Sequence, residues 1–155
     1  MMISPKEYSK TIHEAERYLQ ELTQSNKSIG RPLFESKRTI FLKQGYVSAL
    51  TGLIEACTIF LEKAKTNWNK KLEKYGNYLL TRLEAFTDES WRFKGDDKTV
   101  IREAYKTLKD LQKAIKETIE AKGRVNKKHI EEIQKETDKI LLRLHSIEKE
   151  LALYA

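Results

Sequence analysis

Apolar side chains recur three and four residues apart through most of this 155-residue chain. That spacing places them on one face of an α-helix. The chain holds only six Gly and two Pro, which argues against most all-β folds. The pattern therefore predicts an all-α, up-and-down bundle of four to five helices, formed as a single domain by residues 1–155. The expected helices cover approximately residues 5–24, 36–65, 67–86, 97–122 and 126–154.

Several helix ends carry local signals. Ser4 can cap the first helix, and Asp97 is the expected N-cap of the fourth. Gly123 is a natural stop for that fourth helix, and Asn126 is a suitable N-cap for the last. Because the turn between the last two helices is so short, we expect them to pack as an antiparallel hairpin.

The segment from about Ser36 to Lys65 is the most apolar and is the expected central helix. Small residues recur along it at steps of four, three and four, which lets another helix approach closely. They are Gly45, Ala49, Gly52 and Ala56. Packing within the subunit is the favoured interpretation, and a self-association seam is the alternative.

The last helix has a regular heptad pattern, in which apolar positions alternate steps of three and four. Its members are Ile130, Ile133, Thr137, Ile140, Leu144, Ile147, Leu151 and Tyr154. This seam can pack within the chain or bind another chain. Intrachain packing is favoured, because the other helices also have apolar faces to cover.

The composition is that of a soluble folded chain, with 39% hydrophobic and 34% charged residues and a net charge of +7. Much of the positive excess lies between residues 31 and 74. The predicted basic surface consists of Arg31, Lys37, Arg38, Lys43, Lys70, Lys71 and Lys74, with Trp68 and Tyr75 nearby. Such a surface can bind nucleic acid. The favoured interpretation is solvated lysines with the two aromatic residues in the core.

Cys57 is the only cysteine, so no intrachain disulfide can form and a reducing, cytoplasmic location is expected. The start of the chain lacks the pattern of a secretory signal. The longest uncharged run, Gln44 to Ile54, is 11 residues long, and no membrane span is expected. The three histidines have no metal-ligand spacing, so neither a metal nor a cofactor is predicted.

Arg124 and His129 are separated by four residues at the start of the last helix. This spacing resembles the R-x(4–6)-H motif of the HEPN superfamily, helical bundles that include ribonucleases and partners of nucleotidyltransferases. The resemblance implies that Arg124 stabilises an RNA phosphate and that His129 transfers protons across a dimer, without a metal. Val125 departs from the family, in which a polar residue usually follows the Arg. Gly123 as a helix stop and Asn126 as a cap explain the same segment without chemistry.

The longest predicted loop within the bundle contains Trp91, Arg92, Phe93 and Lys94, in which aromatic and cationic side chains alternate. Trp and Arg are enriched at interface hot spots, so this segment is a candidate anchor for a protein partner. The alternative is that both aromatic side chains fold back to close one end of the bundle.

The segments Tyr8 to Leu19 and Tyr46 to Leu50 resemble a family of short bacterial proteins that is defined only as a domain of unknown function. The resemblance implies a compact helical bundle and no functional residues. The leading hypothesis is a non-enzymatic interaction or scaffolding protein that binds another protein, or itself as a homodimer, through a helical face. The alternative is a HEPN-like, RNA-associated bundle.

Overall fold

The computed structural model of the chain describes residues 37–154. The first predicted helix, its Ser4 cap and Arg31 of the predicted basic surface lie outside the described residues. The described residues contain no strand, and the all-α bundle is confirmed. Their helices are α2 (Lys37–Thr66), α3 (Lys70–Ala85), the short 3₁₀ helix η1 (Ser90–Arg92), α4 (Gly95–Glu120) and α5 (Lys127–Ala152).

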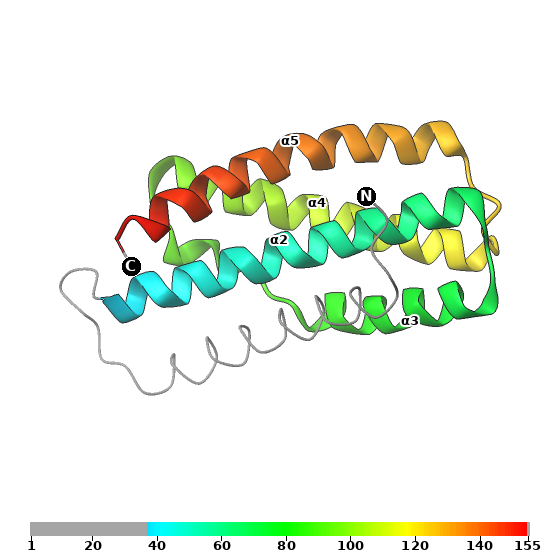
Figure 1. The fold of residues 1–155 in the computed structure, drawn as a ribbon, viewed down its shortest axis with the longest axis horizontal. Helices are drawn as coiled ribbons and strands as arrows, with labels where there is room; N and C mark the ends of the chain where they lie inside the picture. Colours follow the sequence, from blue (N-terminus) through cyan, green and yellow to red (C-terminus); the bar gives the residue numbers. More distant parts are fainter. Residues whose placement is uncertain (1–36, 155) are drawn as a thin grey trace.

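Successive helices run in opposite directions, so the topology is up-and-down (Figure 1). Helix α2 packs against α3, α4 and α5, and α4 packs in turn against α3, α5 and η1. The α4–α5 hairpin predicted from the short turn is present. One end of the bundle holds the start of α2, η1 and the end of α5 (Figure 1). The opposite end holds the start of α3 and the α4–α5 turn (Figure 1).

Helix α2 supplies the largest share of the core, as its composition predicts. Half of its 30 residues are buried, including Leu50, Ile54 and Phe60, which are completely inaccessible. Within the small-residue stripe, Ala49 and Ala56 are 1% exposed in the single chain, which agrees with packing inside the subunit. By length and composition alone α2 could span a membrane, but 67% of its most apolar stretch is buried inside the bundle, as in a core helix.

Helices α3 and α4 do not begin where they were predicted to begin, because their N-cap residues were not identified correctly. Helix α3 begins at Lys70 and not at residue 67, because the Asn69 side chain accepts a 2.8 Å hydrogen bond from the Leu72 backbone N–H. Helix α4 begins at Gly95, so Asp97 is not its N-cap. Asp96 and Asp97 lie instead in the first turn, where negative charge interacts favourably with the helix dipole.

The α4–α5 turn follows the local signals closely. Lys122 and Gly123 both have positive φ, at 50° and 82°. The Gly123 N–H then bonds the Thr118 carbonyl at 3.0 Å and ends the helix. Asn126 caps α5 by accepting hydrogen bonds from the backbone N–H groups of Lys128 and His129, as predicted.

The heptad seam of α5 faces the core along nearly its whole length. Six of its members are buried, and Ile133 is partly buried against the core; the six are Ile130, Thr137, Ile140, Leu144, Ile147 and Leu151. Tyr154 lies beyond the end of the helix and is 62% exposed, so its inclusion in the seam was wrong. Intrachain packing therefore uses the seam.

Helix α3 approaches the core most closely at Gly76. A Cβ atom added there would lie 2.7 Å from the Phe60 ring and 2.9 Å from Ile119 Cδ1. Phe60 is completely buried, so its ring has little space into which it can move. The absence of a side chain at Gly76 thus sets the distance between α3 and α2.

We expect Gly76→Ala to destabilise the protein by about 1–3 kcal/mol, as overpacking of a core does. The better helix propensity of Ala, about 1 kcal/mol, opposes this cost. Urea unfolding followed by circular dichroism measures the difference. Asn77→Ala, at an exposed neighbouring position in α3, is the matched control and should be neutral or slightly stabilising. A Gly76→Ala variant as stable as Asn77→Ala would show that the α3–α2 contact is loose.

Candidate functional site

The segment between α3 and α4 is fixed to α2 by one side chain. The Tyr46 hydroxyl donates a 2.9 Å hydrogen bond to the Thr87 carbonyl and accepts a 3.1 Å bond from the Glu89 N–H. Its ring stacks on the Phe86 ring with ring centres 5.2 Å apart, and its centre lies 6.1 Å from that of the Phe93 ring. Burial raises the pKa of Tyr46 well above its ordinary value, so the hydroxyl stays protonated and able to donate.

Short local bonds shape the rest of this segment. The Asp88 carboxylate accepts a 2.9 Å bond from the Ser90 N–H, and the Phe93 N–H bonds the Ser90 carbonyl at 3.0 Å. Phe93 is 3% exposed, and the Lys43 ammonium lies 5.6 Å from the centre of its ring. The alternative predicted from the sequence was that Trp91 and Phe93 both fold back to close one end of the bundle. That alternative is correct for Phe93.

Trp91 does the opposite and projects from the surface with 60% of its area exposed. The Arg92 guanidinium stacks 4.3 Å from the centre of the indole ring. Arg92 Nε in turn lies 3.4 Å from Glu89 Oε2, and the two side chains are only 10% and 14% exposed. A mostly buried ion pair thus supports an exposed aromatic ring, while Lys94 is exposed beside it.

Other large apolar side chains are exposed at the same end of the bundle. Phe41 is 52% exposed near the start of α2, and Leu153 and Tyr154 are 81% and 62% exposed after α5. These elements and η1 share one end of the molecule (Figure 1). Exposed apolar groups gathered in one region are typical of protein-binding surfaces.

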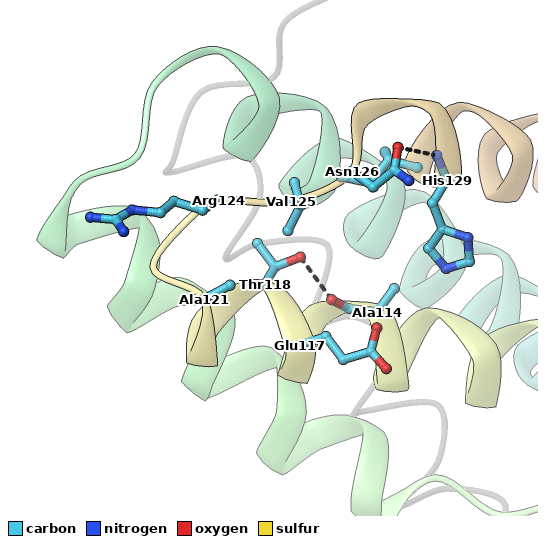
Figure 2. Close-up of a pocket in the computed structure, with 9 residues that line it drawn as sticks. Ala114, Glu117, Thr118, Ala121, Arg124, Val125, Asn126 and His129 are labelled. Carbon is cyan, nitrogen blue, oxygen red and sulfur yellow. Dashed lines mark hydrogen bonds between the residues drawn. The ribbon is translucent and has the colours of Figure 1, made fainter.

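Arg124 and His129 line one pocket of about 200 Å³ beside the α4–α5 turn. Its other polar groups include Glu117 and the buried Thr118, whose hydroxyl donates to the Ala114 carbonyl at 2.7 Å. Arg124 extends to one side of this pocket, and His129 lies on the other (Figure 2). The two side chains of the motif therefore point apart within one chain.

The predicted basic surface is divided in the structure. Lys37 and Arg38 are exposed at the start of α2, whereas Lys70, Lys71 and Lys74 are exposed on α3 at the other end. A helix of 30 residues is about 45 Å long, and this length separates the two groups. Lys43 is 8% exposed and packs over Phe93, so it does not belong to a surface patch. The interpretation of these residues as one surface was wrong.

Three further titratable side chains lie on α2 or against it, namely Glu55 and Cys57 on α2 and His145 on α5. His145 Nε2 lies 3.7 Å from Glu55 Oε1 on α2, and its Nδ1 lies 3.9 Å from Glu148 Oε2. Burial raises the pKa of Glu55, and His145 opposes that rise. Cys57 is completely buried, which also raises the pKa of its thiol. Within residues 37–154, no group of three or more metal-ligating side chains is assembled.

Sequence reasoning missed the role of Tyr46, which lies within the apolar segment predicted as the central helix. A Tyr among buried apolar positions could have indicated a hydrogen bond at this site, because a buried Tyr hydroxyl needs a hydrogen-bond partner. The partners are backbone groups about 40 residues away, and no spacing rule identifies them.

No family model matches the chain, and no significant match is found among curated proteins or solved structures. The resemblances to HEPN bundles and to the bacterial family of unknown function therefore stay predictions.

We expect Tyr46→Phe to destabilise the protein by about 1–3 kcal/mol, because it leaves the Thr87 carbonyl and the Glu89 N–H without their partner. The change in free energy of unfolding is measured in urea. Tyr154→Phe removes the hydroxyl of an exposed residue and should change stability by less than about 0.5 kcal/mol. Equal stability of the two variants would mean that the Tyr46 hydroxyl does not fix the segment.

Proposed function

We propose that this chain is a non-enzymatic protein-interaction module of the cytoplasm, and that its binding surface is centred on Trp91. The observation that supports the proposal is the 60% exposure of this ring on a segment that is otherwise fixed to the core. A large aromatic side chain left in water on a well-ordered segment has no role in the core.

The contacts that hold the segment around Trp91 in place favour binding. The Tyr46 hydroxyl and the buried Phe93 ring hold the segment on both sides of the indole. The Arg92 guanidinium lies over one face of the ring, and its Nε is 3.4 Å from the Glu89 carboxylate. A partner that covers Trp91 therefore orders few side chains on this chain, which lowers the entropic cost of association.

The surface around Trp91 suits a protein partner with an apolar pocket. Phe41, Leu153 and Tyr154 are exposed apolar side chains of elements at the same end (Figure 1), and Lys94 is an exposed cation three residues after Trp91. Trp is among the residues that dominate interface energies, and a polar rim around it is typical of such sites. The partner is another protein or a second copy of the chain, which would form a homodimer.

The test is a quantitative pull-down of tagged protein from its native cells, combined with sedimentation of the pure protein to detect self-association. We expect Trp91→Ala to weaken binding of the specific partner, or of the second copy, by at least about tenfold, since hot-spot truncations cost about 2 kcal/mol or more. Circular dichroism should show an unchanged fold.

Leu142→Ala is the matched control, because Leu142 is 70% exposed on α5. It should bind like the wild type. A Trp91→Ala variant that retains every partner and the same oligomeric state contradicts the proposal.

A HEPN-like, RNA-associated bundle is the second candidate. Its support is that Arg124 and His129 line the same pocket. In the family mechanism the Arg holds the phosphate and the His transfers a proton, which imidazole can do near neutral pH. Since the two side chains point apart in one chain, this mechanism requires a second subunit to complete the site (Figure 2).

This candidate predicts metal-independent cleavage of a generic RNA by the pure protein, and loss of that cleavage in His129→Ala. A gel assay with chelator present measures it. His145→Ala replaces another half-exposed histidine and should remain active. If the wild type cleaves no RNA, or if both variants behave alike, the nuclease hypothesis is wrong.

A further inference from the structure

Positive charge is concentrated at the end of the bundle opposite Trp91. Residues 67–75 and 116–129 together hold eight lysines or arginines and three glutamates, a balance of +5 in a chain whose net charge is +7. These segments form the start of α3, the end of α4 and the start of α5, which meet at one end (Figure 1). Most of the net charge therefore lies in a small part of the surface.

Packing of the α2–α3 linker on the α4–α5 turn brings the two segments together. A Cβ atom at Gly123 would lie 2.6 Å from Trp68 Cβ, so these two backbone segments are in close contact. Trp68 also meets Phe60 edge-on, with ring centres 6.1 Å apart. The contact brings the residues just before α3 against the α4–α5 turn, although about 50 residues separate the two in the sequence.

The cations of this end are exposed, and among the described residues none of them forms an ion pair. Glu73, Glu117 and Glu120 lie in the same segments and offset part of the charge. We call this surface the basic end. It consists of Lys70, Lys71, Lys74, Lys116, Lys122, Arg124, Lys127 and Lys128.

We propose that the basic end binds the phosphate backbone of a nucleic-acid duplex without reading its sequence. Lysine and arginine contacts to phosphates release counterions, and this release supplies nearly all of the affinity in non-specific binding. A rigid surface formed by three helix ends can meet several phosphates at once, because its cations do not have to be gathered on binding.

The composition of the basic end favours this ligand over a protein or a bilayer. Lysine is depleted in protein–protein interfaces, which rely on aromatic anchors. The large apolar side chains that are exposed in the described part of the chain lie elsewhere; they are Phe41, Trp91, Leu142, Leu153 and Tyr154. Membrane-surface binding combines basic residues with inserted apolar ones, and the basic end exposes no large one.

A duplex fits better than a single strand. Single-strand binders use aromatic side chains as platforms on which bases stack. Trp68 is partly buried and packs against Phe60, so its ring does not offer an open face. Contacts to the regular backbone of a duplex require only the exposed cations.

The test uses the full chain and a fluorescently labelled duplex of about 20 base pairs, with binding followed by anisotropy over a salt series. The basic-end variant replaces Lys71, Lys74, Lys127 and Lys128 with Gln. At about 50 mM salt, we expect its affinity to fall by about tenfold or more. The slope of log affinity against log salt should become shallower by about 0.9 for each phosphate that the variant no longer neutralises.

A control variant of equal net charge replaces Lys106, Lys113, Lys139 and Lys149 with Gln. These lysines are exposed along α4 and α5. We expect it to bind like the wild type, as should Trp91→Ala, so failure of the Trp91 proposal is distinguishable from failure of this one. The duplex is tested as DNA and as RNA, and binding to either supports the proposal.

Four outcomes overturn the proposal. The first is no duplex binding by the wild type at about 50 mM salt, and the second is an equal loss in the basic-end and control variants, which would reflect net charge alone. The third is tighter binding to the separated strands than to the duplex. The fourth is binding to vesicles that contain phosphatidylserine with none to nucleic acid. Circular dichroism verifies that both sets of substitutions leave the fold intact.

Discussion

Burial of α2 on several sides organises the described part of the molecule. Half of the residues of α2 are buried, among them Leu50, Ile54 and Phe60, and α3, α4 and α5 all pack against this one helix. The hydrophobic effect supplies the driving force, and the small residues of α2 allow close approach. Gly76 shows the same constraint from the side of α3, because the Phe60 ring occupies the space that a side chain there would need.

The two ends of α2 support chemically different surfaces. Near its start, Tyr46 holds the segment that presents Trp91, and the exposed groups there are largely apolar. At its far end, Trp68 contacts the α4–α5 turn and brings basic residues from distant parts of the sequence together. Our proposals assign a protein partner to the first surface and a nucleic-acid duplex to the second. The rigid bundle between them keeps the two about one helix length apart.

The parts of this structure that the sequence predicts are those determined by neighbours along the chain. Helical periodicity identified the described helices, and Asn126 and Gly123 have the predicted capping roles because both depend on local backbone geometry. The start of α4 was misplaced because Lys94, in its N-cap position, makes no side-chain cap bond.

Burial of Lys43 depends on tertiary packing, so spacing alone could not reveal it. The opposite directions of the Arg124 and His129 side chains likewise depend on the orientation of the turn, which their spacing in the sequence does not predict (Figure 2).

Cys57 is completely buried in the middle of α2, and burial raises the pKa of its thiol. A thiol reagent needs both physical access and the thiolate form, and the folded bundle withholds both. Its modification therefore proceeds through opening of the helices around α2, at a rate governed by that opening. Because Cys57 is the only cysteine of the chain, the rate at which a thiol reagent modifies the protein reports how often the helices around α2 open.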